Sequence, residues 1–210
     1  MTHPADMLQP PSLALRLINL FAPVEDSESI VGDLLEEFSH LASNAGVAFA
    51  RRWFWRQTVK SITHLFGRGF LGAPWSTAAV VAGGFLLLKF VSGLPDMLLS
   101  VLTDRYLAFW STHFQAYSWV LKGMLPAHLI AIMFVGKIVA LVAKGREMVA
   151  TMMLALVLSG LIGVALGWVG MHRSLDVAWM LSSCADPLVI VMGGAIIRTR
   201  RTAASLRSAE

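Results

Sequence analysis

The chain has 210 residues, of which 56% are hydrophobic and only 14% are charged, whereas soluble domains usually carry about a quarter charged residues. This composition excludes an ordinary soluble protein, because so much apolar surface requires lipid as part of its solvent. The net charge is +4, but the basic residues lie next to apolar runs, which indicates phospholipid headgroups and no nucleic acid as their partner.

The first part of the chain, residues 1–72, has the pattern of a cytoplasmic helical module. A short helix is predicted over residues 12–20, after two prolines that suit a first turn. A second, amphipathic helix is predicted over residues 24–43, with carboxylates in its first turns. A third is predicted over residues 47–65. The sequence therefore predicts about three helices, the second acidic and the third basic.

The rest of the chain, residues 73–210, is much more apolar. Its start is a predicted flexible joint, formed by Gly67, Gly69, Gly72 and Pro74. Four apolar runs follow, each near the roughly 20 residues that cross a bilayer as a helix. They lie at about residues 76–97, 124–143, 148–170 and 178–197. Because only helices or closed barrels satisfy the backbone in lipid, and these runs lack strand alternation, we predict an all-α fold with a membrane four-helix bundle.

The basic residues predict the orientation of these spans. Twelve lysines and arginines lie before the first span, between the second and third, or after the last, and three lie in the two connections on the opposite side. Under the positive-inside rule, both termini are expected in the cytoplasm of a bacterial cell, with the chain in the inner membrane.

The long connection between the first two spans, residues 98–123, carries large residues every three or four positions. They are Leu102, Tyr106, Phe109, Trp110, Phe114, Tyr117 and Leu121. We predict a helix that lies in the outer interface, with its aromatic rings at headgroup depth. Two interpretations stay open: membrane anchoring, and a flap that gates a substrate or binds a partner.

The third span contains small residues at four-residue spacing, namely Ser159, Gly163 and Gly167. This pattern lets helix backbones approach closely in lipid. It predicts packing against a neighbouring span of the same chain, with homodimerisation as the alternative.

Two ionisable residues of opposite charge lie deep in the predicted spans. Lys89 and Asp186 are each about twelve residues from the cytoplasmic end of their span, which corresponds to a depth of roughly 18 Å. Since paired ions cost far less than lone ions in a low dielectric, we predict a contact between Lys89 and Asp186. The pair is either a structural tie between the first and fourth spans or part of a proton or ion relay.

No motif of an enzyme is present: the chain has no phosphate-binding glycine loop and no nucleophile elbow. The six histidines are scattered, and the single cysteine, Cys184, excludes an internal disulfide. We therefore expect no catalytic residue, no metal site and no cofactor.

Three blocks near the N-terminus occur in a recognisable order: PPSLALRL from Pro10, GDLLEEF from Gly32, and ARRWFWRQ from Ala50. Over residues 10–66 the chain resembles the permease prefix domain that precedes macrolide-exporter-like ABC permeases of bacteria. The resemblance implies a cytoplasmic helical module attached to a transport-related membrane protein. The third block suits contact with headgroups or with a partner through Arg51, Arg52, Trp53, Trp55 and Arg56.

These observations favour an accessory or regulatory component of a bacterial transport system, in which residues 1–72 dock another membrane protein or a transport ATPase. Two other functions stay open. One is a small autonomous transporter or channel that uses Lys89 and Asp186. The other is a membrane-bound sensor that binds a cytoplasmic regulator. The sequence predicts no oligomeric state.

Overall fold

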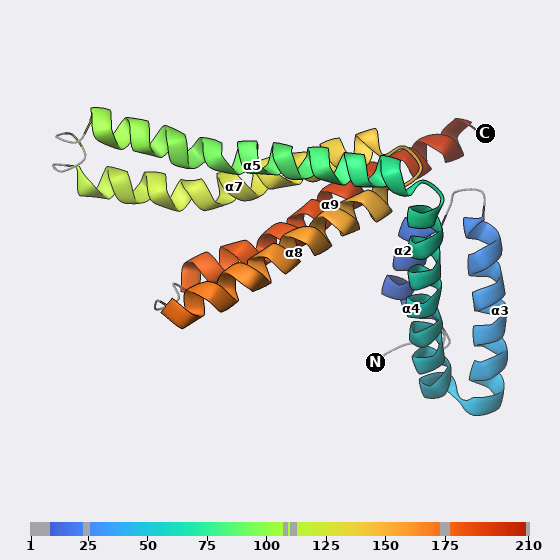
Figure 1. Cartoon of the computed structure of the whole chain (residues 1–210). Helices are drawn as coiled ribbons and strands as arrows, with labels where there is room; N and C mark the ends of the chain where they lie inside the picture. The colour runs from blue at the N-terminus through green and yellow to red at the C-terminus, as the bar shows by residue number, and fades with distance from the viewer. Residues whose placement is uncertain (1–8, 23–25, 107–108, 110–112, 173–176, 209–210) are drawn as a thin grey trace. The chain divides into compact units, whose positions relative to one another are not determined.

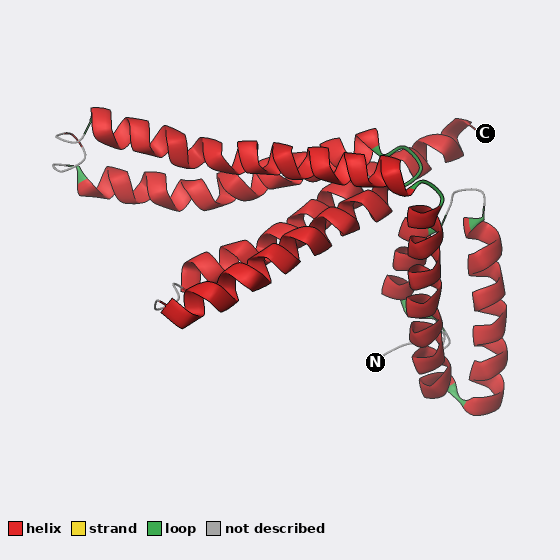
Figure 2. Ribbon diagram, viewed as in Figure 1, coloured by secondary structure: helices red, strands yellow, loops and turns green. Residues whose placement is uncertain are grey.

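The computed structural model describes residues 9–22, 26–106, 109, 113–172 and 177–208. Every regular element within these ranges is an α-helix, and none of them is a strand (Figure 2). The prediction of an all-α chain is therefore confirmed. The chain divides into two compact units, Met1–Pro74 with Arg201–Glu210, and Trp75–Arg200, which we call unit 1 and unit 2.

Among the described residues before Pro74, unit 1 contains the helices α2 (Ser12–Phe21), α3 (Ser27–Ala45) and α4 (Val47–Leu71) (Figure 1). Helices α2 and α3 both pack against α4. The core between them includes Ile18, Leu34, Phe38 and Phe54, all of which are buried. The rings of Phe38 and Phe54 meet edge to face with centroids 5.7 Å apart, which is a favourable geometry for aromatic pairs. Unit 1 thus has a hydrophobic core of its own.

A single glycine separates α3 from α4. Gly46 has a φ of 87°, in the region that L side chains avoid and glycine adopts freely. This conformation ends α3 at Ala45 and lets α4 begin at Val47 without a longer loop. The predicted second helix, residues 24–43, thus ends two residues before α3 does.

Helix α4 is longer than the sequence predicts. It continues through Gly67 and Gly69 to Leu71, so the predicted flexible joint reduces to Gly72 and Ala73. Glycine in a helix costs only about 1 kcal/mol relative to alanine, so it weakens a helix without ending it. Only two residues therefore separate α4 from the next helix.

Unit 2 is built from α5 (Pro74–Arg105), α7 (Phe114–Val142), α8 (Glu147–His172) and α9 (Val177–Ser208), the last of which ends beyond the unit. Two stretches, Pro74–Leu94 and Glu147–Trp168, are long and apolar enough to cross a membrane. The four predicted spans fall within the four helices, but only α5 and α8 contain such a stretch among the described residues. A bundle of four membrane spans is therefore still a prediction.

The prediction of a separate interfacial helix over residues 98–123 is wrong. Helix α5 continues to Arg105, and α7 already begins at Phe114. Nothing interrupts the helix between Leu98 and Arg105, so residues 98–105 extend α5 and do not start a new helix. Trp110, predicted at headgroup depth, lies outside the described residues.

One hydrophobic core joins the four helices of unit 2. Its buried members include Leu88 of α5, Ile132 of α7, Leu154 of α8 and Ile190 of α9. Away from this core, the pair of α5 and α7 diverges from the pair of α8 and α9 (Figure 1). Large apolar side chains on the diverging parts are exposed, among them Met97, Val101, Val164 and Trp168. Such surfaces are typical of lipid-facing helices.

Glycines permit the closest helix contacts in this core. A Cβ on Gly136 of α7 would collide with the carbonyl group of Ile190 of α9, and one on Gly193 would collide with that of Met133. On α5, a Cβ at Gly84 would meet Val139. Helices α7 and α9 therefore touch backbone to backbone, as small residues allow in membrane proteins.

Candidate functional site

The most unusual contact in unit 2 joins an aspartate to a histidine within apolar surroundings. Asp186 of α9 faces His128 of α7, with Nε2 of the imidazole 3.4 Å from Oδ2 and 3.3 Å from Oδ1 of the carboxylate. The side chains are 15% and 26% exposed, respectively. Both lie one helical turn before buried core residues, Ile190 and Ile132. The two helices therefore carry a matched pair of titratable groups at one level.

The carboxylate of Asp186 is only partly satisfied. Oδ2 accepts a hydrogen bond from the imidazole, whereas Oδ1 is buried and has no hydrogen-bond partner, although it lies within ion-pair distance of the same nitrogen. One N–H group cannot point at both oxygens. A buried oxygen without a donor is costly, so the Asp186 carboxylate is a candidate functional group in the described part of unit 2.

The predicted contact between Lys89 and Asp186 does not form. Lys89 is exposed, and its ammonium group lies 5.6 Å from the ring centroid of Phe85 on its own helix. The preceding residue, Leu88, is the one that faces the core. Successive residues on a helix point about 100° apart, so the depth of Lys89 matches that of Asp186 but its direction does not. His128 takes the place that the sequence assigned to Lys89.

The predicted packing stripe of α8 also lies elsewhere than expected. Nothing lies within 4 Å of a Cβ built on Gly163 or Gly167, and the exposed Ser159 donates its hydroxyl hydrogen to the Ala155 carbonyl at 2.8 Å. The core face of α8 is formed by Leu154 and Leu158. Ser159 follows Leu158 by one position, so its stripe points to another side. Among the described side chains, none packs against Gly163 or Gly167, and both packing within the chain and homodimerisation stay predictions.

A second polar contact lies at the start of α8, between Glu147 and Arg198. Arg198 of α9 approaches Glu147 of α8, with Nη1 3.8 Å from Oε2, and both side chains are buried. Oε1 of Glu147 accepts the Gly145 backbone N–H at 3.1 Å. Arg146 donates to the Ser76 hydroxyl at 3.1 Å. These bonds tie the short connection between α7 and α8 to α5 and α9, which indicates a structural role.

The aromatic and basic residues of the third sequence block separate into two faces of α4. Trp53 is half-buried and packs on the core of unit 1, with its ring 6.5 Å from that of Phe54. Trp55 is 37% exposed. Arg51, Arg52 and Arg56 are exposed. A surface contact thus has Trp55 and the arginines available, whereas Trp53 stabilises the fold.

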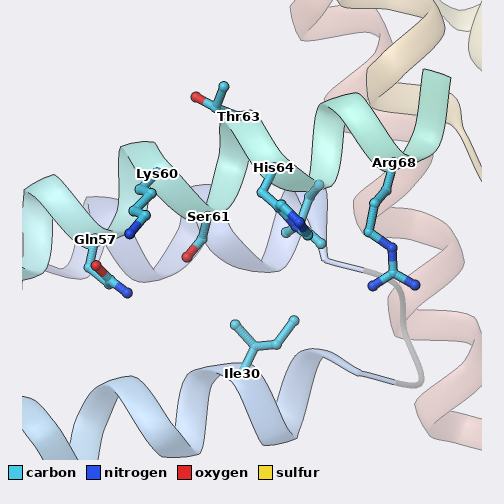
Figure 3. A pocket seen from close by; sticks show the side chains of 8 residues that line it. Ile30, Gln57, Lys60, Ser61, Thr63, His64 and Arg68 are labelled. Carbon is cyan, nitrogen blue, oxygen red and sulfur yellow. The ribbon is translucent and has the colours of Figure 1, made fainter. Parts of the chain in front are cut away.

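A groove lies between α3 and α4 of unit 1 (Figure 3). Lys60, His64 and Arg68 follow one another at four-residue spacing on α4 and point toward Ile30 of α3. No acidic residue is among those that line it; they are Ile30, Gln57, Lys60, Ser61, Thr63, His64, Leu65 and Arg68. We call this the basic groove. Its chemistry suits an anionic or acidic ligand.

Within the described residues, no three side chains of His, Cys, Asp or Glu lie close enough to hold a metal ion. The fold and these sites define the class of the protein: an all-α chain that combines a separately packed helical unit with helices able to cross a membrane. No protein-family model, curated protein or solved structure matches the chain. The resemblance to the permease prefix domain therefore stays a prediction.

Sequence reasoning missed His128 because it compared depths only for fully charged residues. A usable signal was present. His128 precedes Gly136 by eight residues, and Asp186 precedes Gly194 by the same number, so both polar groups lie about two turns before a small residue. Small residues mark helix contacts in membranes, and a search for polar residues at equal distance from them would have found this pair.

Proposed function

We propose that this chain is a multi-pass protein of the bacterial inner membrane that acts as an accessory or regulatory component of a transport system. Unit 2 would supply four spans, α5, α7, α8 and α9, with both termini in the cytoplasm. Two membrane-competent stretches support this placement, as do the exposed apolar side chains on the diverging parts of the helices. The basic residues around the Glu147 end favour that end as the cytoplasmic one.

The observation that carries the proposal is the separate packing of unit 1. It has its own buried core, and only Gly72 and Ala73 separate its helix α4 from α5. A module on so short a connection stays at the membrane surface, where a membrane-embedded partner or its ATPase is within reach. Unit 1 is therefore proposed as the docking element.

The basic groove is the proposed contact point for the partner. Lys60 and Arg68 offer positive charge, His64 offers a polar imidazole, and Ile30 offers an apolar contact. An acidic, partly apolar segment of another membrane protein or of a transport ATPase would fit both. Outside the groove, Arg52, Trp55 and Arg56 are proposed to rest against anionic headgroups, because tryptophan and arginine favour the membrane interface.

Co-purification tests this function. Full-length tagged protein is isolated from native membranes with the triple change Lys60→Gln, His64→Gln and Arg68→Gln, and its associated proteins are identified. We expect a transport protein or ATPase to accompany the wild type and to be lost from the variant, because the groove loses its charge.

The matched control neutralises three exposed carboxylates of α3 with Asp33→Asn, Glu36→Gln and Glu37→Gln. This variant should retain the partner. Equal recovery of the partner with the groove variant would refute docking at the groove, and recovery of a transcriptional regulator in place of a transport protein would favour the sensor function.

One observation favours a second function, a small transporter or channel. The pair of His128 and Asp186 lies within apolar helices, where ionisable residues often mark an ion path. Liposomes that contain the purified protein would then show flux that Asp186→Asn abolishes and Asp104→Asn, at an exposed position of α5, leaves intact. Absence of flux in the wild type excludes this alternative under the conditions tested.

A further inference from the structure

The contact between His128 and Asp186, in the described part of unit 2, is a feature that helix packing does not explain. Two titratable side chains from different helices meet in apolar surroundings, and one carboxylate oxygen is buried without a hydrogen-bond partner. Most buried polar atoms in proteins have a hydrogen-bond partner, so an unsatisfied one needs an explanation. We propose that His128 and Asp186 form a proton-binding site that fastens α7 to α9.

The chemistry of the pair requires a single bound proton. This proton is in addition to the one N–H that a neutral imidazole always carries. It lies either on the imidazole of His128, which gives an imidazolium beside a carboxylate, or on Oδ2 of Asp186, which gives a carboxylic acid beside a neutral imidazole. Transfer along the hydrogen bond interconverts the two forms, and the pair has no net charge in either. Loss of this proton leaves a lone carboxylate, and gain of a second leaves a lone imidazolium. Both are unfavourable in a low dielectric.

None of the other described charged side chains of the bundle forms an ion pair with His128 or Asp186. Lys89 of α5 lies over Phe85, and Lys137 of α7 lies 4.8 Å from the ring centroid of Phe134. On α8 and α9, Glu147 and Arg198 lie close to each other, and Arg198 follows Asp186 by twelve residues, or about 18 Å along the helix. The charge state of the site therefore depends on the two partners themselves.

The position of the site gives the proton a structural effect. The backbones of α7 and α9 touch at Gly136 and Gly193, and His128 lies about two turns before Gly136 along α7. The pair is thus the outermost contact between α7 and α9 among the described polar side chains. A singly protonated site holds the diverging parts together, and a charged site releases them.

The inference relies on the proposed placement of unit 2 in a bilayer and is independent of partner docking. Its test is the thermal stability of the full-length protein in lipid nanodiscs as a function of pH. For the wild type we expect a maximum with a fall on both sides, because either a second proton or the loss of the first leaves one buried charge.

Single substitutions should remove one side of this profile each. In Asp186→Asn the remaining imidazole is neutral at high pH, so only the fall toward acid should persist. In His128→Gln the remaining carboxyl is neutral at low pH, so only the fall toward alkali should persist. The exchanged pair, His128→Asp with Asp186→His, should regain both sides. Asp104→Asn, at an exposed position of α5, should keep the wild-type profile.

A second measurement covers the case in which a variant folds poorly. Infrared spectra follow the carbonyl band of the protonated Asp186 carboxyl, identified as the band that Asp186→Asn removes. A shared proton requires that the pH at which this band disappears shifts in His128→Gln. An unchanged midpoint would overturn the proposal, as would identical stability profiles for the wild type and both single variants. Protein that fails to enter nanodiscs would instead contradict the membrane placement.

Discussion

Buried aromatic side chains at two positions determine the stability of unit 1. Phe38 and Phe54 have almost no exposed surface, and their rings pack edge to face. Phe49 lies on the same helix as Phe54 but is 51% exposed. Phe49 and Phe54 of α4 therefore form a matched pair for testing whether the core of unit 1 is as described.

We expect Phe54→Ala to destabilise unit 1 by about 3–5 kcal/mol, because it removes a buried ring and leaves a cavity. Phe49→Ala should change stability by less than about 0.5 kcal/mol, as is usual for an exposed site. Hydrogen exchange of the full chain in detergent checks this, since the amides of α3 and α4 should lose protection only in the first variant. Equal loss in both variants would contradict the described core.

At the scale of the elements, the direction of a side chain around its helix decides which residues act together. Lys89 and Gly163 both have the residue type expected of a contact, yet both point away from the core. Leu88 and Leu158 point into it. Sequence spacing gives depth along a helix with fair accuracy, whereas the side that faces a neighbour is decided when the helices pack.

The glycines of α7 and α8 test this difference directly. Gly136→Ala should destabilise the contact between α7 and α9 by at least about 1–3 kcal/mol, because the new methyl group has no space beside the Ile190 carbonyl. Gly163→Ala meets nothing within 4 Å and should leave the monomer unaffected. Thermal melts in detergent compare the two; a larger effect at Gly163 would indicate that another copy of the chain packs there.

At the scale of the whole molecule, the two units differ in the solvent that their surfaces require. Unit 1 exposes charged residues on α3 and α4, whereas unit 2 exposes apolar side chains along its helices. The composition changes near residue 73, and the units divide after Pro74. A chain with these two surfaces is suited to the boundary between cytoplasm and bilayer.

The natural cysteine allows the proposed topology to be tested with little change to the chain. Cys184 is exposed on α9, two residues before Asp186. If this surface lies in lipid, a charged, membrane-impermeant thiol reagent should leave it unmodified in intact membranes and should modify it after solubilisation and unfolding. A cysteine placed at Ser208 of a Cys184→Ser chain should react only after the cytoplasmic side is opened. Reaction of Ser208→Cys in intact cells would contradict the proposed cytoplasmic C-terminus and indicate the opposite orientation.

The sequence by itself determined the helical class, the positions of the long apolar runs and the contrast between acidic α3 and basic α4. These features follow from local pattern and composition, which survive any arrangement of the helices. Tertiary structure alone decided that His128, and not Lys89, meets Asp186, and that Gly136 and Gly193 form the close contact in place of Gly163 and Gly167. The physical reason is that a helix contact depends on the direction of each side chain around the helix axis and on the shape of the neighbouring helix. The spacing of residues along the sequence specifies neither of these.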